Sequence, residues 1–216
     1  MNSLMRSAAG LVLAAGLLLG ACDAGGGSAA PSEPPLDRSS QEVYEAPLDR
    51  AVLSDVSAHD WAAEPLGSRG VDVVGYRLLQ ACRAELATDR RILDERAAGW
   101  QGRGGLPVLD QVVLAYDRPV AADAVRQARA ALTCKTYDPP LVRLPPVRLG
   151  DPLDLGGGAD EFGFCEGPAK GAGNHRCVAI LGSGHIACAV RVLATDQVTA
   201  ADRLRSLMPA LRNVCR

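Results

Sequence analysis

The chain has 216 residues, 48% of them hydrophobic and 22% charged, and its formal net charge at pH 7 is -2. Arginine and acidic residues are interspersed without a basic run, which argues against a nucleic-acid partner and against a polybasic contact with anionic lipid. Only Lys135 and Lys170 are lysines. This arginine bias is typical of a GC-rich bacterial genome, such as that of an actinomycete.

The first 21 residues have the order of an export signal. Arg6 precedes an apolar run over residues 8–19, which leads into Leu19-Gly20-Ala21-Cys22. The run is shorter than the ~20 residues of a membrane-spanning helix, so a signal peptide is favoured over an uncleaved anchor. Because a Cys closes the motif, we predict a lipoprotein signal peptide over residues 1–21. Cys22 would then carry lipid, including palmitate, and hold the protein on the extracytoplasmic side of the cell membrane.

Residues 22–45 contain the lipidated terminus and a stretch rich in Gly, Ala, Ser and Pro. A segment of this composition cannot bury a core and is predicted to be a flexible linker. The remaining residues, 46–216, have the length of one domain. We therefore expect a single extracytoplasmic domain there.

An internal repeat divides this domain. Residues 113–132 and 192–211 align at an offset of 79 without a gap, and ten of twenty positions are identical. Asp117 and Arg126 in the first copy match Asp196 and Arg205 in the second. This predicts two related halves, about 70–137 and 159–216.

Each copy changes from a strand pattern to a helix pattern at the same point. The runs 112–116 and 189–193 are typical of strands, and a helical spacing of apolar residues follows each. Gly182-Ser183 suits a two-residue hairpin turn, with residues 103–104 at the equivalent place. A further helix is expected over 74–86 from Val74, Leu78, Cys82 and Leu86. The predicted fold is α+β, with an antiparallel sheet built from two strand-turn-strand-helix halves.

Six cysteines remain once Cys22 is assigned to lipid, and in an exported chain they predict a disulfide framework. Six cysteines allow fifteen pairings. With Gly182-Ser183 as the turn, Cys177 lies opposite Cys188. Cys134 and Cys215 end the two predicted helices, 52 and 50 residues after Cys82 and Cys165. We therefore predict three disulfides: Cys82–Cys134, Cys165–Cys215 and Cys177–Cys188.

Several segments resemble the extracellular sensor domain of PknH-type mycobacterial kinases and related actinobacterial lipoproteins. They are the Cys82 segment, Ala98-Gly99-Trp100, residues 112–116, Cys134, residues 164–167 and the strand from Cys177. The resemblance covers roughly residues 70–215. It implies a disulfide-stapled α/β domain with antiparallel sheet and a cleft for an unknown ligand. No kinase domain or membrane span is found, and Cys177 and Cys188 look additional to the family's four cysteines.

No catalytic or metal site is predicted. His175, Cys177, His185 and Cys188 are close in sequence, but the expected hairpin and an oxidising compartment favour a disulfide over zinc. Ser183 lies in a turn and lacks the Gly-x-Ser-x-Gly frame of a nucleophile elbow. The acidic residues Asp151, Asp154, Asp160 and Glu161 fit no EF-hand loop and are assigned to a solvated connection. The Pro-rich stretch 138–149 is interpreted as an extended bridge between the halves, with a docking strip as the alternative.

The scarce aromatic residues have two interpretations. Core filling is favoured over a ligand cleft by the usual burial of such side chains. The set is Trp61, Trp100, Tyr76, Tyr116 and Tyr137. The sequence thus predicts a non-enzymatic, membrane-tethered lipoprotein without a cofactor, which binds an unknown small molecule or cell-envelope partner. A cell-envelope enzyme and a purely structural envelope protein are the alternatives.

Overall fold

The computed structural model describes residues 48–53, 64–66, 77–102, 105–139 and 145–215. The predicted signal peptide, Cys22 and the linker lie outside these residues, as do Trp61 and Tyr76. Within the described part, no helix is both long and apolar enough to cross a membrane.

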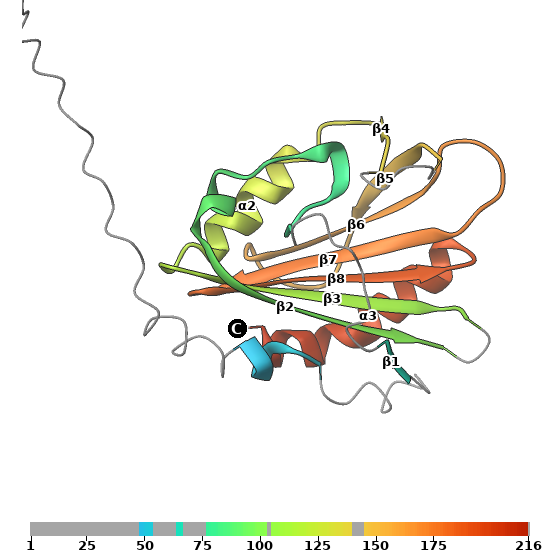
Figure 1. The fold of residues 1–216 in the computed structure, drawn as a ribbon. Coiled ribbons are helices and arrows are strands. Elements are labelled where there is room, and N and C mark those ends of the chain that lie inside the picture. Colours follow the sequence, from blue (N-terminus) through green and yellow to red (C-terminus); the bar gives the residue numbers. More distant parts are fainter. Residues whose placement is uncertain (1–47, 54–63, 67–76, 103–104, 140–144, 216) are drawn as a thin grey trace, which may run out of the picture. The chain divides into compact units, whose positions relative to one another are not determined.

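One antiparallel sheet dominates the domain (Figure 1). Its eight strands run in the order β1-β2-β3-β8-β7-β6-β5-β4, and every neighbouring pair is antiparallel. The strands are β1 (Glu64–Leu66), β2 (Ile92–Gln101), β3 (Val108–Tyr116), β4 (Thr136–Tyr137), β5 (Val147–Leu153), β6 (Glu161–Pro168), β7 (His175–Ser183) and β8 (Ile186–Ala194).

The two main helices cover opposite faces of this sheet (Figure 1). Helix α2 (Ala121–Ala131) packs on the face that presents Val112, Leu114 and Ile180. Helix α3 (Gln197–Val214) packs on the face that presents Val113 and Val190. Because successive strand residues point to opposite faces, the central strands are apolar throughout and supply both cores.

The sequence-based prediction of a helix before the first hairpin is wrong over the described residues. Residues 77–91 form two short 3₁₀ helices, η2 (Ala81–Arg83) and η3 (Ala87–Arg91), in an otherwise irregular segment. Cys82 and Arg83 have φ of 58° and 53°, values that interrupt a right-handed helix. Leu78 and Leu86 are buried against the α2-side core, so burial rather than a helical face accounts for their spacing.

Two of the three predicted disulfides are also wrong. Cys82–Cys134 forms as predicted, but the other bonds are Cys165–Cys177 and Cys188–Cys215. The cause is the register of the second hairpin. Its turn is Gly184-His185, with Ser183 paired to Ile186, so Cys188 lies opposite Leu181 and Cys177 opposite Val192. Strand β6 then places Cys165 directly opposite Cys177.

A short helical turn at 48–51 closes the α3-side core. Leu48, Ala51 and Leu53 are buried there. The buried amide of Gln111 on β3 holds this segment, accepting from the Leu53 N–H at 2.9 Å and donating to the Ala51 carbonyl at 2.7 Å. The segment that follows the predicted linker is therefore tied into the domain through one polar side chain.

Candidate ligand-binding cleft

A cleft of about 690 Å³ opens beside the C-terminal end of α2, between that helix, β5, β6 and the connection over 154–160. Its volume lies within the ~300–1,000 Å³ of small-molecule sites. The lining residues are Arg129, Leu132, Leu149, Gly150, Pro152, Leu153, Asp154, Leu155, Gly157, Gly158, Ala159, Glu161, Phe162, Gly163 and Phe164.

The ladder between β5 and β6 is irregular at the cleft. Leu149 pairs with Glu166, but the next pair is Pro152 with Phe164, which leaves two residues of β5 opposite one of β6. Pro152 has no N–H to donate to a ladder. Gly150 fits against the Cys165 carbonyl, since a Cβ there would lie 3.0 Å from that oxygen. Such a bulge bends a strand and re-aims its side chains, and here it shapes the cleft wall.

Most side chains that line the cleft are apolar. Phe162 and Phe164 come from alternate positions of β6 and stack with ring centroids 6.2 Å apart. Leu132 and Leu149 pack with them against the α2-side core. Leu153 and Leu155 pack instead against the α3-side core. The cleft therefore lies where the two cores of the domain meet the β5–β6 edge.

Arg129 on α2 supplies the guanidinium of the cleft. It donates to the backbone carbonyl of Glu161 at 2.5 Å and lies over the Phe162 ring at 5.4 Å from its centroid. No carboxylate of the described residues lies within ion-pair distance of it. A guanidinium has five N–H donors, and the Glu161 carbonyl engages one nitrogen.

Glu161 is the buried carboxylate of the cleft, and it is fully engaged. Arg212 of α3 binds both of its oxygens, at 2.6 and 3.0 Å, and also donates to the Leu155 carbonyl at 2.6 Å. This bond to Glu161 raises the pKa of Arg212 above its ordinary value. Gly157 leaves room for the pair, because a Cβ there would lie 1.5 Å from Glu161 Oε1.

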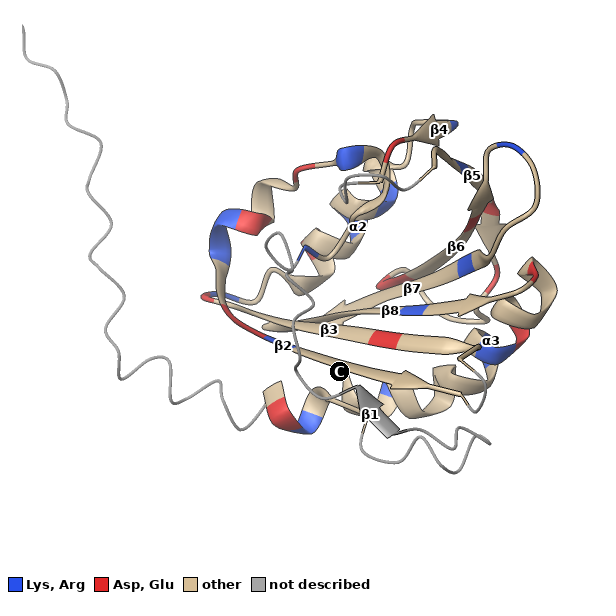
Figure 2. Cartoon of the chain, turned by 45° about the vertical axis from the view of Figure 1, so that its right-hand side comes forward, with Lys and Arg blue, Asp and Glu red and all other residues tan. Residues whose placement is uncertain are grey.

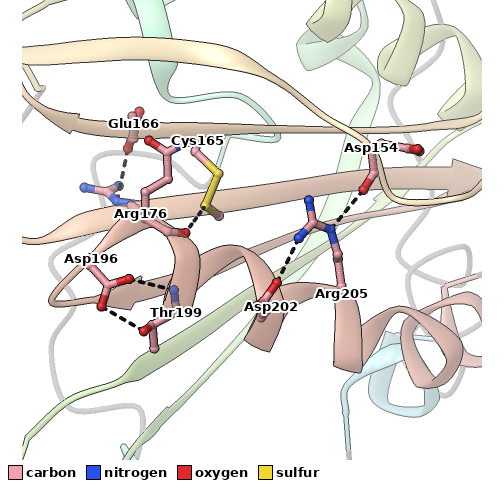
Figure 3. Close-up of a disulfide and its surroundings, with 10 residues drawn as sticks. Asp154, Cys165, Glu166, Arg176, Asp196, Thr199, Asp202 and Arg205 are labelled. Atoms are coloured by element: carbon pink, nitrogen blue, oxygen red, sulfur yellow. Dashed lines mark hydrogen bonds and ion pairs between the residues drawn. A yellow bond between two sulfur atoms is a disulfide. The ribbon is translucent and has the colours of Figure 1, made fainter.

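The same β5–β6 connection is tied to α3 a second time. Arg205 donates to the Asp154 carbonyl at 3.3 Å and pairs with Asp202 at 2.9 Å, as Figure 3 shows. The Cys165–Cys177 disulfide lies nearby, with Cys177 Sγ 3.8 Å from the Gln197 carbonyl. Helix α3 therefore holds this wall of the cleft through Arg205 and Arg212, which donate to the carbonyls of Asp154 and Leu155.

A second group of charges lies in a row across the α2 face of the sheet, at one end of the strands. Figure 2 shows charged bands on the neighbouring strands β3, β8, β7 and β6. Buried Glu166 pairs with Arg176 at 3.1 Å and accepts from the Tyr137 hydroxyl. Buried Arg191 pairs with Asp110 at 2.7 Å. Burial and the neighbouring Glu166 charge raise the pKa of Tyr137 well above its ordinary value. The row contains two acidic and two basic residues, and each acid is paired with a base of the same row. We therefore assign these residues a structural role.

Most of the residues considered for chemistry in the sequence lie outside the cleft. Cys177 and Cys188 are in separate disulfides, and the described residues contain no group of three or more His, Cys, Asp or Glu able to hold a metal. Ser183 ends β7 next to the hairpin turn and is exposed. Of the acidic residues in the connection, Asp154 and Glu161 line the cleft.

Aromatic residues do line the cleft, but not those considered in the sequence. Trp100 and Tyr116 are buried in the two cores, and Tyr137 belongs to the charged row. The cleft instead uses Phe162 and Phe164. Their alternate spacing between two glutamates, Glu161-Phe-Gly-Phe-Cys-Glu166, indicates one face of a strand. That signal was available in the sequence.

Comparison with known proteins assigns neither a family nor a function to the chain. No protein-family model and no curated protein matches the chain. A crystal structure of the extracellular domain of PknH from Mycobacterium tuberculosis is similar, with a TM-score of 0.45 and 11% identity. The match covers 57% of this chain and 64% of that one, less than two thirds of its length. A likeness of this size says nothing about ligand or activity, and the lipoprotein and actinobacterial assignments stay predictions.

Proposed function

We propose that this protein is a membrane-tethered, extracytoplasmic lipoprotein that binds a small molecule or envelope component in the cleft beside α2. The observation that carries the proposal is the cleft itself, an open cleft in which eight of fifteen lining side chains are apolar and in which Arg129 has no carboxylate partner among the described residues. Its buried carboxylate, Glu161, has both oxygens on Arg212. This arrangement favours binding over acid–base catalysis, because a general acid or base needs a carboxyl oxygen that can reach the substrate.

The disulfides support export. Cys82–Cys134 joins η2 to the residues after α2, Cys165–Cys177 joins β6 to β7, and Cys188–Cys215 joins β8 to the end of α3. Structural disulfides persist mainly in oxidising compartments outside the cytosol. Together with the predicted lipobox, they favour an extracytoplasmic domain held to the membrane by Cys22.

The proposed relation between the halves 70–137 and 159–216 has partial support. Each contains an antiparallel hairpin followed by a helix. The helices carry equivalent i,i+3 ion pairs, Asp123–Arg126 and Asp202–Arg205. The two helices nevertheless pack on opposite faces, so a duplication would have required one helix to change face.

Two measurements test the proposal. The full chain, expressed in a bacterium that processes lipoproteins, should yield an N-terminal peptide that begins at Cys22 and carries lipid. A Cys22→Ser variant should leave the membrane fraction, and its retention there would contradict tethering.

Binding is tested by thermal shift of the purified full chain against fractionated cell-envelope extracts. Ala159 is exposed and lines the cleft, so Ala159→Trp should block it. Ala130 is exposed on α2 outside the lining, and Ala130→Trp is the matched control. We expect a fraction that stabilises the wild type and the control but not Ala159→Trp. Stabilisation of all three, or of none, would refute a binding role for the cleft.

A further inference from the structure

The guanidinium of Arg129 is the starting point. The cleft has three charged lining residues. Glu161 is paired with Arg212, and Asp154 is exposed and accepts from the Gly156 N–H at 2.9 Å. Arg129 has a backbone carbonyl and an aromatic face instead of an anion. A guanidinium anchored in this way is pre-oriented and retains donors for a planar or tetrahedral anion, which it binds through paired charge-assisted hydrogen bonds.

The lining around that cation is more apolar than polar. Eight of the fifteen lining residues have apolar side chains and four are glycines. The guanidinium lies over the Phe162 ring, and Leu132, the residue that follows α2, also lines the cleft. A fully polar ligand would leave the leucine and phenylalanine surfaces without a partner, and a purely apolar ligand would partly desolvate Arg129 without satisfying its donors.

We infer that the cleft binds an anionic amphiphile, with a carboxylate or phosphate on Arg129 and an alkyl chain along Phe162, Leu132 and Leu149. This inference rests on the proposed binding function of the same cleft and names the ligand class. Asp154, at the cleft wall, disfavours an anion elsewhere in the cavity and so fixes the orientation of the charged end toward α2. Free fatty acids and single-chain lipid phosphates share this chemistry.

The test uses the purified full chain and four probes of equal chain length, each below its micelle concentration. Dodecanoate and dodecyl phosphate represent the two sources of the anion, dodecanol removes the charge, and dodecyltrimethylammonium reverses it. Isothermal titration calorimetry should give at least tenfold tighter binding for one or both anionic probes than for dodecanol, and no binding of the cation. The affinity for the anions alone should fall as salt is raised.

Variants of two arginines on the same helix decide the assignment. Arg129→Gln should remove the tenfold preference for the anions, and Arg129→Lys should keep part of it. Arg126 is exposed and paired with Asp123 outside the cleft, so Arg126→Gln should behave as wild type. The salt dependence of the wild type serves as the second measurement if Arg129→Gln is unstable.

Three results would overturn the inference. The first is that dodecanol binds as tightly as the anionic probes. The second is that Arg129→Gln still prefers the anionic probes to dodecanol. The third is that none of the four probes binds. If every probe fails while an envelope fraction still gives the shift that Ala159→Trp abolishes, the ligand class is wrong and the binding function stands. If that shift is absent as well, both proposals fail.

Discussion

Replacing Gln111 by Ala should release residues 48–53 from the domain while the sheet stays folded. Gln111 is fully buried on β3, and its amide makes the two hydrogen bonds that hold the Ala51 carbonyl and the Leu53 N–H. Its Nε2 also lies 3.7 Å from Cys215 Sγ, beside the Cys188–Cys215 disulfide. The substitution therefore removes the polar attachment of this segment and leaves a cavity against a disulfide.

The energies favour detachment. Burial of Leu48 and Leu53 contributes about 1.5–3 kcal/mol each, or about 3–6 kcal/mol together. Ordering the backbone of six residues costs about 1–2 kcal/mol each, or about 6–12 kcal/mol. The segment therefore needs its hydrogen bonds, which contribute about 1 kcal/mol each, and leaving the two backbone groups buried without partners would cost about 1–3 kcal/mol each. Exposing the segment to water avoids that cost.

Hydrogen exchange followed by mass spectrometry measures this outcome. In Gln111→Ala, amides of 48–53 should exchange at open-chain rates while those of β7 and β8 stay protected, and the thermal midpoint should fall by roughly 5–10 °C. The control is Gln101→Ala, because Gln101 is exposed on β2 and donates to the Gly105 carbonyl. This substitution should change stability by less than about 0.5 kcal/mol. Persistent protection of 48–53 in Gln111→Ala, with an unchanged midpoint, would refute the reasoning.

Three further outcomes are expected. Gly157→Ala should lower the free energy of unfolding by about 2–4 kcal/mol in chemical denaturation, because its Cβ meets Glu161 and separates the buried pair; Gly158→Ala, with open space at its Cβ, should be nearly neutral, and equal effects would contradict the account. A non-reduced digest should yield a Cys165–Cys177 peptide. Removing that bond should cost about 3 kcal/mol, against about 4 kcal/mol for the longer Cys82–Cys134 loop, and the reverse order would count against loop entropy. Asp196 caps α3 by accepting from the Thr199 N–H, which lowers its pKa. The ionised Asp196 cap therefore stabilises the folded state fully above the ordinary Asp pKa of about 3.9, and this stabilisation is lost as pH falls through the lowered pKa of the folded state. The thermal midpoints of wild type and Asp196→Ala should differ at pH 7 and converge in strong acid.

The sequence predicted the parts of the fold that local pattern determines. Strands β3 and β8, helices α2 and α3, the antiparallel sheet and the Cys82–Cys134 bond all follow from residue spacing. The register of the second hairpin did not follow, because Gly182 and Gly184 are both acceptable first residues of a two-residue turn. Only Gly184 has the positive φ of 56°.

Packing explains the other glycine. A Cβ on Gly182 would lie 2.9 Å from the Cβ of Ala187 and 3.2 Å from that of Ala121. Gly182 is therefore required by the close approach of α2 to the hairpin, not by the turn. The need for glycine at this position comes from tertiary packing and leaves no pattern in the local sequence. Placing the turn at Gly182 shifts it by two residues, and this shift makes two of the predicted disulfides wrong.

The residues that form the cleft do not follow from the sequence for a related reason. Residues 138–149 and 151–161 lack a strand pattern and are rich in Pro, Gly and Asp, so the sequence predicts a bridge and a solvated connection there. In the structure, β5 forms within this stretch because β6 supplies a pairing partner, with a bulge at the step from Leu149 to Pro152. Pairing with a distant edge overrides a weak local preference for extended structure.

Strand β6 connects the cleft to the rest of the domain, and its fixation bears on how the cleft binds. Glu161 at its start is held by Arg212 of α3, Cys165 is bonded to β7, and Glu166 is held by Arg176 and Tyr137. Phe162 and Phe164 lie between these attachments, so the cleft floor is fixed from both ends before any ligand arrives. A preorganised site loses little conformational entropy on binding, and Arg129 is likewise already seated on Phe162. The free energy of binding should therefore depend mainly on the ligand's own chain and charge, which is the property that equal-length probes of different charge measure.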